Sequence, residues 1–403
     1  MKTVKECLET EVKYECDVLV AGGGFAGIAA ALSAARAGRA MGQKTRVILL
    51  ERGFMLGGLA TAGLVTIYLA LCDGRGHKVA RGIAEELFML SIKHGAEARY
   101  PTAWLDGGTE EERAKYRFEV QFNPQLFAIE AEKLLSSEGV KILYGATAVG
   151  CGVNDKKITH VMIEGKGGRE AISVSRSVVD STGDADVCKL SFAKTVNFTP
   201  GNKLAAWYYG YGNHNYDLYM CGVNDIKLDT ATSIPDDFRF SGLDTDELSR
   251  VTEISHSALL SDLLKRRSEI PDLVPVTIGT IPQVRMTRRL SGAIEQGIEE
   301  QSYADTVGLF PNWKKRGPVY ELSFGALYGG EIINLLTAGR CISVTEEMWD
   351  VTRVIPVCAV SGEAAGAAAA MFDHMPCADV TLLQSYLKGV GVLLHRDEER
   401  DDG

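Results

Sequence analysis

The sequence has no pair of cysteines at CxxC spacing, although it contains nine cysteines. An odd number of cysteines without close pairs argues against a disulfide framework, a zinc site and a thioredoxin-like redox pair. We therefore predict no metal site. Reduced, buried thiols in a reducing compartment fit these residues best, so we predict a cytoplasmic protein.

Basic residues are also in deficit. Lys and Arg number 43 against 53 Asp and Glu, which gives a net charge of -10. Phosphate backbones are bound by basic surfaces, so we expect no nucleic-acid partner. The first 14 residues are charged throughout and lack the apolar segment of a signal peptide. Residues 53–72 are uncharged but contain four glycines, so we predict a buried segment and no membrane partner.

The length of 403 residues suggests two or three domains at roughly 150 residues each. From about residue 192 to 316 the sequence is richer in Tyr, Asp and Ser and less periodic than its flanks. We therefore predict one domain in two parts, at residues 1–191 and 317–403, with a second domain at 192–316 inserted between them. A homo-oligomer is compatible with this composition.

A strand–turn–helix–strand unit stands near the N-terminus. Cys16–Ala21 is an apolar run typical of a buried strand, and Ile28–Ala40 is rich in alanine and predicts a helix. Arg46–Leu50 predicts a second buried strand, which ends at Glu51. Further along the chain, Ala171–Val178 and Val179–Thr182 each predict a strand.

The turn of this unit carries a dinucleotide-binding motif. Gly22, Gly24 and Gly27 fit GxGxxG, in which the glycines allow a tight turn, close approach of a diphosphate and close helix packing. The helix beginning near Phe25 and Ala26 would direct free N–H groups at the diphosphate. Glu51, 24 residues after Gly27, is a typical acceptor for ribose hydroxyls.

Three further segments resemble flavoproteins with the glutathione-reductase-like fold. They are the second glycine segment at residues 51–63, the segment Val179–Asp186 and the C-terminal segment Asn334–Ser343 with Arg353–Pro356 and Gly362–Gly366. The chain is identified as a member of the bacterial FAD-dependent oxidoreductases. The resemblance implies an α/β fold, namely a Rossmann-like FAD-binding domain with an inserted α+β substrate domain, and FAD as the cofactor. In addition to the residues of the first turn, it implies cofactor contacts from Arg52, Gly57, Gly58, Ala60, Thr61, Ala148, Thr182, Gly183, Asp184, Gly339, Arg340, Pro356 and Val357.

One position departs from many relatives of this fold. They carry an acid after the C-terminal glycine, where it holds the ribityl chain, whereas Gly339 is followed by Arg340. Asp184 could replace that acid.

Four residues are candidates for catalysis. Arg353 precedes the helix that begins near Pro356 and could add positive charge beside flavin N1 and C2=O; a structural ion pair is the alternative. Arg288 and Arg289 lie in an arginine-rich stretch that the family also carries, and they could bind a carboxylate or phosphate, or serve as structural pairs. His214 lies in an aromatic stretch at residues 207–219. That stretch could line a substrate pocket with His214 or a tyrosine as proton donor or acceptor, but we favour a β-sheet core for it.

The motifs predict hydride transfer between a small organic substrate and flavin N5. A second GxGxxG is absent, so no second module for NAD(P)H is expected, and the lack of CxxC excludes a disulfide-reductase mechanism. The alternatives are a flavin monooxygenase, a flavoprotein acting on RNA and a catalytically silent FAD-binding scaffold.

The purified protein is expected to be yellow and to release FAD on denaturation, because GxGxxG and Glu51 suit a diphosphate and an adenosine ribose. Chromatography of the released flavin checks this. Release of FMN, or a colourless protein that takes up no FAD, would contradict it.

Overall fold

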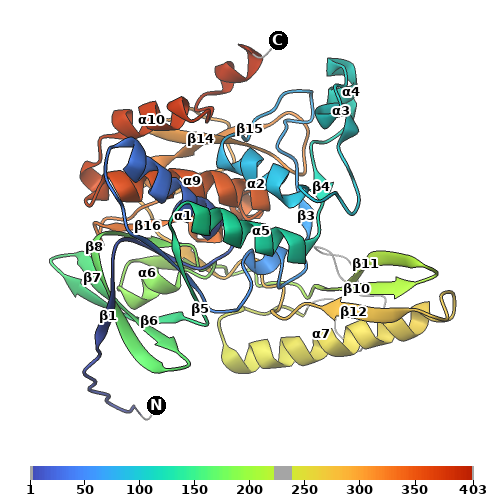
Figure 1. Ribbon diagram of the computed structural model, residues 1–403, viewed down its shortest axis with the longest axis horizontal. Coiled ribbons are helices and arrows are strands. Elements are labelled where there is room, and N and C mark those ends of the chain that lie inside the picture. The colour runs from blue at the N-terminus through green and yellow to red at the C-terminus, as the bar shows by residue number, and fades with distance from the viewer. Residues whose placement is uncertain (1–2, 222–237, 402–403) are drawn as a thin grey trace.

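The computed structural model describes residues 3–221 and 238–401 (Figure 1). Its centre is a seven-stranded sheet in the order β5-β2-β1-β8-β7-β6, in which β16 pairs with the C-terminal end of β8. The strands are β5 (Lys141–Tyr144), β2 (Val47–Glu51), β1 (Val12–Ala21), β8 (Gly168–Asp180), β7 (Lys157–Gly165), β6 (Thr147–Asn154) and β16 (Leu335–Thr337). The pairs β5–β2, β2–β1, β1–β8 and β8–β16 are parallel, whereas β6, β7 and β8 form an antiparallel meander. This is the Rossmann-like α/β fold that the sequence predicts.

The parallel strands are apolar on both faces because both faces are covered. Val18 and Val20 of β1 point into a core shared with helices, and Leu19 and Ala21 point into a second core on the opposite face. Helices α1 (Phe25–Ala40) and α9 (Ile355–Met371) form the centre of the first core. Such two-sided burial explains why β1 and β2 read as continuous hydrophobic runs.

Helices α1 and α9 approach each other at backbone distance. A Cβ at Gly366 would lie 2.1 Å from the Ala30 carbonyl oxygen, and one at Gly362 would lie 2.3 Å from that of Ala26. The alanines of both helices are almost all fully buried. Small side chains therefore allow the two helices to pack at a separation that larger residues would prevent.

Strand β8 is a single element of 13 residues, Gly168–Asp180. The prediction of two strands, at 171–178 and 179–182, was wrong, because the backbone pairing with β1 continues through Val178 and Val179 to Asp180. Residues 181 and 182 instead form the turn that follows the strand.

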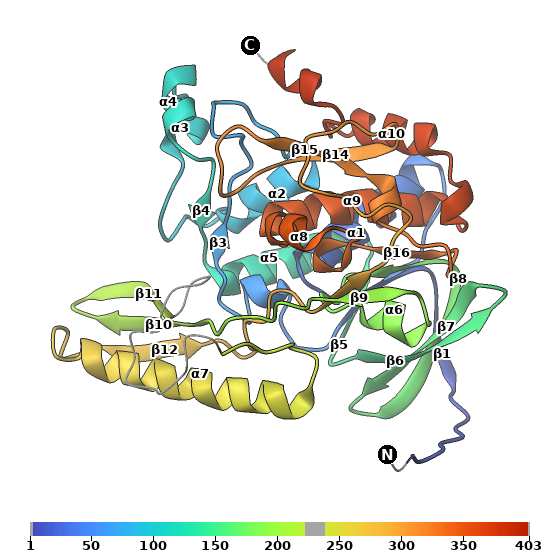
Figure 2. The ribbon, with the colours of Figure 1, turned by 180° about the vertical axis from the view of Figure 1, so that it is seen from behind.

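The inserted region forms an arm built from a small antiparallel sheet and one long helix. The sheet has the order β11-β10-β12, with β10 at Ala206–Gly212, β11 at Asn215–Cys221 and β12 at Val274–Ile278. Helix α7 (Thr245–Arg266) runs along the outer side of this sheet (Figures 1 and 2). This is the α+β architecture expected of the insertion.

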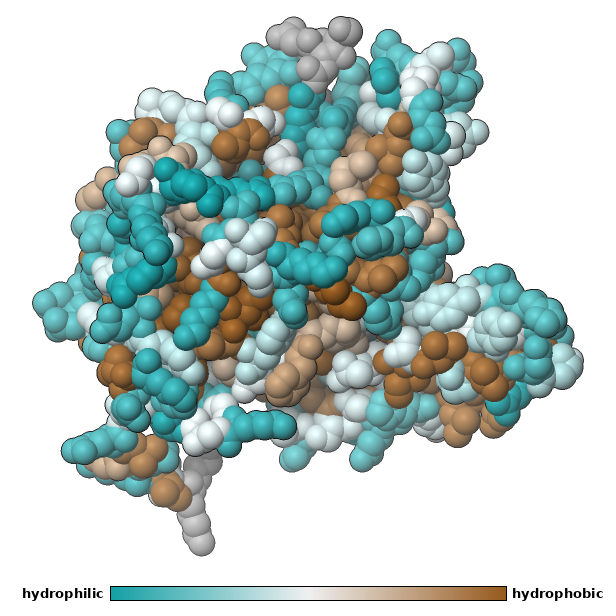
Figure 3. Space-filling model, viewed as in Figure 1, coloured by the Kyte–Doolittle hydropathy of each residue, from teal (hydrophilic) through white to brown (hydrophobic). Residues whose placement is uncertain are grey.

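The aromatic stretch forms the core of the arm's sheet, the alternative that the sequence favoured. Tyr208 is 1% exposed and packs with Leu259 and Leu263 of α7. Trp207 and Tyr209 point to the other face and pack on Leu64, in the segment after the second glycine motif. Away from this contact the arm exposes apolar residues, and hydrophobic patches appear on it in Figure 3; exposed members include Leu260, Leu264, Val274 and Val276.

Two further strand pairs lie outside the central sheet and the sheet of the arm. Strand β9 (Thr195–Asn197) pairs with β13 (Arg288–Leu290), where the chain enters and leaves the arm. Strand β14 (Thr306–Pro311) pairs with β15 (Val319–Ser323). The predicted boundary between residues 316 and 317 lies in the connection between β14 and β15, so the strands on either side of it belong together.

The remaining α-helices have between four and 14 residues, and the remaining strands have two residues each. They are α2 (Ile83–Ser91), α3 (Thr102–Leu105), α4 (Glu110–Lys115), α5 (Pro124–Ser137), α6 (Asp186–Leu190), α8 (Glu346–Thr352), α10 (Val380–Gly389), β3 (Ile67–Tyr68) and β4 (Val120–Gln121). Across residues 3–221 and 238–401, no single helix is long and apolar enough to cross a membrane. The bent pair α8–α9, at 93°, meets that criterion by length and composition only.

Replacing Gly366 with Ala should lower the free energy of unfolding by about 1–3 kcal/mol, because the new methyl group would overpack the contact with Ala30. Urea denaturation measures this. Gly389→Ala in α10 is the matched control: a Cβ there meets no atom within 4 Å, so stability should stay equal or rise slightly. Equal effects of the two substitutions would contradict the packing argument.

Candidate functional site

The first glycine turn joins the end of β1 to α1 and touches the end of β8. Gly22 has φ +102°, and a Cβ there would lie 2.5 Å from the Ser181 carbonyl oxygen. A Cβ at Gly27 would lie 1.8 Å from the Gly22 carbonyl oxygen. At Gly24, in contrast, a Cβ would meet nothing within 4 Å. The packing of the chain therefore requires glycine at positions 22 and 27, whereas Gly24 faces open space.

This open space lies at the start of a helix of 16 residues. Gly24 is the N-cap of α1, no side chain caps the helix and its first turn carries no acid. The first intrahelical hydrogen bond runs from the Ile28 N–H to the Gly24 carbonyl, at 2.9 Å. The N–H groups of Phe25, Ala26 and Gly27 precede it and remain for a ligand. Such a terminus favours a diphosphate through hydrogen bonds and the helix dipole.

The second glycine segment is bound to the first by main-chain contacts. The Gly57 N–H donates to the Gly23 carbonyl at 2.8 Å, and Gly24 and Gly57 form an isolated parallel bridge. Gly57 has φ +101°, a conformation suited to glycine. The Thr61 hydroxyl donates to the Leu56 carbonyl at 2.5 Å and closes the turn that contains Gly58 and Ala60. Arg52, at the start of this segment, is exposed.

Glu51 ends β2 beside both glycine segments. Its carboxylate accepts hydrogen bonds from the Gly23 N–H at 3.0 Å and the Gly53 N–H at 2.6 Å, and it is 9% exposed. Burial raises the pKa of the Glu51 carboxyl, and the two N–H donors oppose that shift. Each carboxylate oxygen can accept a further hydrogen bond, so Glu51 can also hold ribose hydroxyls.

The turn after β8 forms the third wall of the candidate cofactor site, and the two glycine segments form the other two. The fully buried Asp180 accepts hydrogen bonds from the Thr182 hydroxyl at 2.7 Å and the Cys188 N–H at 2.9 Å. The Ser181 hydroxyl donates to the carbonyls of Ala21, at 2.8 Å, and Gly22, at 2.9 Å. These bonds hold the 180–184 turn against the first glycine turn.

Two arginines, Arg340 and Arg288, link the FAD-binding domain to the inserted region near Asp184. Arg340 lies directly over Gly183, 3.7 Å from the Asp184 carboxylate, and donates to the Val284 carbonyl at 2.9 Å. In the other direction, Arg288 of the inserted region donates to the Asp184 carbonyl at 2.9 Å and to Asp186 at 2.8 Å. Burial, with Asp180 and Asp184 nearby, raises the pKa of Asp186 to about 6.

Asp184 is accordingly engaged in the domain contact. Its Oδ1 atom accepts a hydrogen bond from the Thr287 hydroxyl at 2.8 Å and faces Arg340. Its Oδ2 atom accepts no hydrogen bond from the part of the chain that the structure describes. That oxygen is the one suited to a ribityl hydroxyl, and the proposed substitution for the missing acid stays a prediction.

The first turns of α1 and α9 meet at Gly339. A Cβ at Gly339 would lie 2.8 Å from the Ala26 Cβ and 3.4 Å from the Cys358 sulfur, and the Gly339 N–H donates to the Ser361 hydroxyl at 2.9 Å. Pro356 and Val357 are buried in the first turn of α9, which has no side-chain cap and no acid. Two uncapped helix N-termini therefore converge on one region, which suits an anionic ligand.

The four candidate catalytic residues occupy different places. Arg353 donates to Asp350 through Nε at 2.9 Å and Nη2 at 2.6 Å, and its side chain is 8% exposed. Arg289 is paired with Glu295 and lies over the Trp349 ring, whereas Arg288 is in the domain contact. His214 is exposed in the β10–β11 turn. This turn is at the far end of the arm in Figure 1. Ala148 lies on β6 opposite Ile163.

Some contacts of this region had no signal in the sequence. The Gln283 side chain donates to the Gly63 carbonyl at 2.8 Å, and the Thr280 N–H donates to the Ala62 carbonyl at 2.7 Å. Both belong to the inserted region and hold the end of the second glycine segment. Ser181 lies within a segment that the sequence indicated, but its bonds to β1 depend on how the strands pair.

The model of the family described as FAD dependent oxidoreductase matches residues 17–203 and 295–382, well over half of the chain. The chain belongs to this family. The FAD-dependent oxidoreductase therefore binds FAD as its cofactor, and the three walls described above fit that ligand. No curated protein sequence matches this oxidoreductase.

Solved structures of similar fold include several oxidoreductases. A geranylgeranyl bacteriochlorophyll reductase-like protein from Thermoplasma acidophilum is 13% identical, with a TM-score of 0.46 over 94% of this chain and 83% of that chain. A p-nitrophenol 4-monooxygenase from Pseudomonas putida is 12% identical, with a TM-score of 0.46 over 93% and 81%. A 3-ketosteroid dehydrogenase from Rhodococcus jostii is 14% identical, with a TM-score of 0.41 over 90% and 98%. At these scores the similarities identify neither a substrate nor a reaction.

Replacing Gly24 with Val should abolish FAD retention and leave the fold intact, because the side chain would enter the open space at the helix terminus. The flavin-to-protein ratio and the melting temperature of the apoprotein measure the two effects. Gly330→Val is the control, since a Cβ at Gly330 also meets nothing within 4 Å but lies outside the glycine segments. Stoichiometric flavin in the Gly24 variant would contradict the placement of the diphosphate.

Proposed function

We propose that this FAD-dependent oxidoreductase transfers a hydride between a carbon atom of a small organic substrate and flavin N5. The observation that carries the proposal is the convergence of the α1 and α9 N-termini with Glu51 and the two glycine segments. When bound, FAD supplies the hydride acceptor or donor, and the protein supplies orientation and electrostatics.

The roles of the residues follow from their positions. The first turn of α1 holds the diphosphate, and Glu51 holds the adenosine ribose. The first turn of α9, at Pro356 and Val357, directs its positive end at N1 and C2=O, where negative charge gathers on reduction. Arg353 adds positive charge that water screens little, because its side chain is 8% exposed; Asp350 offsets part of that charge.

We place the substrate between the arm and the FAD-binding domain. Small-molecule sites form preferentially at domain interfaces. Trp207 of the arm is 4% exposed and packs on Leu64, and the Arg285 guanidinium lies 5.7 Å from the Trp207 ring centroid. An aromatic ring with an adjacent cation suits a small substrate with an apolar body and a polar or anionic group. Arg288 and Arg289 stay candidates, with Asp186 and Glu295 as their ion-pair partners in the structure.

Anaerobic mixing of the holoenzyme with a library of alcohols, amines and carboxylates should identify a donor that bleaches the flavin stoichiometrically. NADH and NADPH should reduce it slowly, since the sequence has no second dinucleotide motif. Absorbance at the flavin band, followed by stopped flow, gives both rates.

Two results would overturn the proposal. Rapid, saturable bleaching by micromolar NADPH, with oxygen consumption coupled to a hydroxylated product, would indicate a flavin monooxygenase. Salt-sensitive retention of RNA with modification of that RNA would indicate a flavoprotein acting on RNA, despite the net charge of -10.

A further inference from the structure

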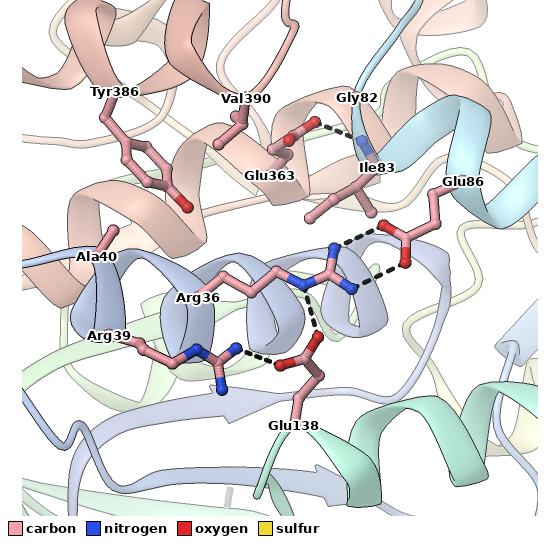
Figure 4. Close-up of a pocket in the computed structure, with 10 residues that line it drawn as sticks. All are labelled: Arg36, Arg39, Ala40, Gly82, Ile83, Glu86, Glu138, Glu363, Tyr386 and Val390. Atoms are coloured by element: carbon pink, nitrogen blue, oxygen red, sulfur yellow. Dashed lines mark hydrogen bonds and ion pairs between the residues drawn. The ribbon is translucent and has the colours of Figure 1, made fainter.

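A pocket separate from the candidate FAD site lies beside the middle of helix α9. It has a volume of about 540 Å³ and is formed by the C-terminal ends of α1 and α5, the start of α2, the middle of α9 and α10 (Figure 4). This volume is in the range of small-molecule sites. Glu363 follows Pro356 by seven residues, or about 10 Å along the helix, so the pocket is separate from the proposed flavin site.

One wall of this pocket carries charges that neutralise each other. Arg36 donates to both Glu86 oxygens, at 2.6 and 2.8 Å, and through Nε to Glu138 at 2.9 Å. Arg39 is paired with the other oxygen of Glu138. Two arginines thus face two glutamates, and Figure 4 shows them joined in one row. A further anion would have to displace Glu86 or Glu138 from these arginines.

Glu363 is the charged group of the pocket that this network does not pair. It is 4% exposed, and its Oε2 atom accepts a hydrogen bond from the Ile83 N–H at 2.9 Å, which caps the start of α2. A Cβ at Gly82 would lie 2.5 Å from this oxygen, so glycine makes room for the carboxyl. The Oε1 atom has no hydrogen bond to the described part of the chain.

The surroundings of Glu363 favour its neutral form until a cation arrives. Burial raises the pKa of the Glu363 carboxyl to about 8; Glu86 adds to the shift, while the Ile83 N–H and Arg36 oppose it. The Tyr386 hydroxyl points into the same pocket in Figure 4, and burial beside Glu363 raises its pKa to about 12, so it stays protonated. With Glu363 ionised, the pocket charges of Arg36, Arg39, Glu86, Glu138 and Glu363 sum to -1.

We propose that this pocket binds a small amine as its ammonium ion, with the ammonium on Glu363 and Tyr386 and an apolar body on Ile83, Val390 and Ala40. The carboxylate and the phenol oxygen accept the N–H donors, and the aliphatic side chains cover the rest. Because the amine enters already protonated, the proton on Glu363 is released to solvent as the ion pair forms. The ligand would contact the same helix that we direct at the flavin without touching the cofactor.

Isothermal titration calorimetry of the holoenzyme with n-hexylammonium chloride tests this. Titrations at pH 7 in two buffers of different ionisation enthalpy should give release of about 0.9 proton per ligand, because a group with a pKa near 8 is mostly protonated there. Release should fall toward zero above about pH 9.5, where Glu363 is already ionised. The neutral 1-hexanol and the anionic hexanoate should show no saturable binding in the same range.

Variants separate the amine site from general effects. Glu363→Gln should bind hexylammonium at least about tenfold more weakly and release no proton, while its amide oxygen keeps the cap on Ile83. Tyr386→Phe should weaken binding about threefold to tenfold and retain the proton release. Glu85→Gln is the matched control, because Glu85 lies in the first turn of α2, which Glu363 caps, but pairs with Lys78 at 2.7 Å. This variant should bind hexylammonium as tightly as the parent protein.

The proposal is overturned by any of four results. These are binding without proton release, unchanged affinity in Glu363→Gln, equal binding of hexanol or hexanoate, and no saturable heat up to about 10 mM hexylammonium.

Discussion

The main-chain contact between the first glycine turn, the end of β8 and helix α9 is the constraint on which the rest of this protein depends. Gly22 and Gly27 allow α1 to start against Ser181, and Gly362 and Gly366 allow α9 to lie against the main chain of α1. These contacts leave no room for a Cβ atom. Because α1 and α9 are held this closely, their uncapped N-termini converge on one region, and we place FAD there.

The two parts of the FAD-binding domain are far apart in the sequence, and the inserted region forms hydrogen bonds with both of them. Arg340 from the C-terminal part reaches the Val284 carbonyl of the insertion, and Arg288 of the insertion reaches Asp184 and Asp186. All of these groups are next to the 180–184 turn. The contact that we predict between Asp184 and FAD would therefore lie next to the base of the arm, where we place the substrate.

The middle of α9 shows how one helix can serve two purposes. Its first turn is directed at the flavin region, while Glu363, two turns later, caps α2 and lies beside a charged row formed by α1, α2 and α5. A neutral buried carboxyl is costly to ionise without a partner. This position can therefore respond to a cation.

Much of the FAD site was predictable because its residues act through local backbone geometry. The glycine spacing, the helix predicted at Ile28–Ala40 and the strand ending in Glu51 each follow from short-range patterns, and the structure confirms these elements. Aromatic residues 207–209 likewise form a sheet core, as favoured. The division of β8 into two strands failed, because its length depends on pairing with β1 rather than on its own composition.

The sequence by itself determined the dinucleotide motif, the family and hence the cofactor, since these depend on glycines and acids at short, regular spacing. Only the tertiary structure decided the partners of Arg288 and of Glu363. Arg288 pairs with Asp186, and Glu363 caps a helix that begins 280 residues earlier. Side-chain partners of this kind depend on which surfaces the fold brings together, and the spacing of residues along the chain does not show which surfaces meet.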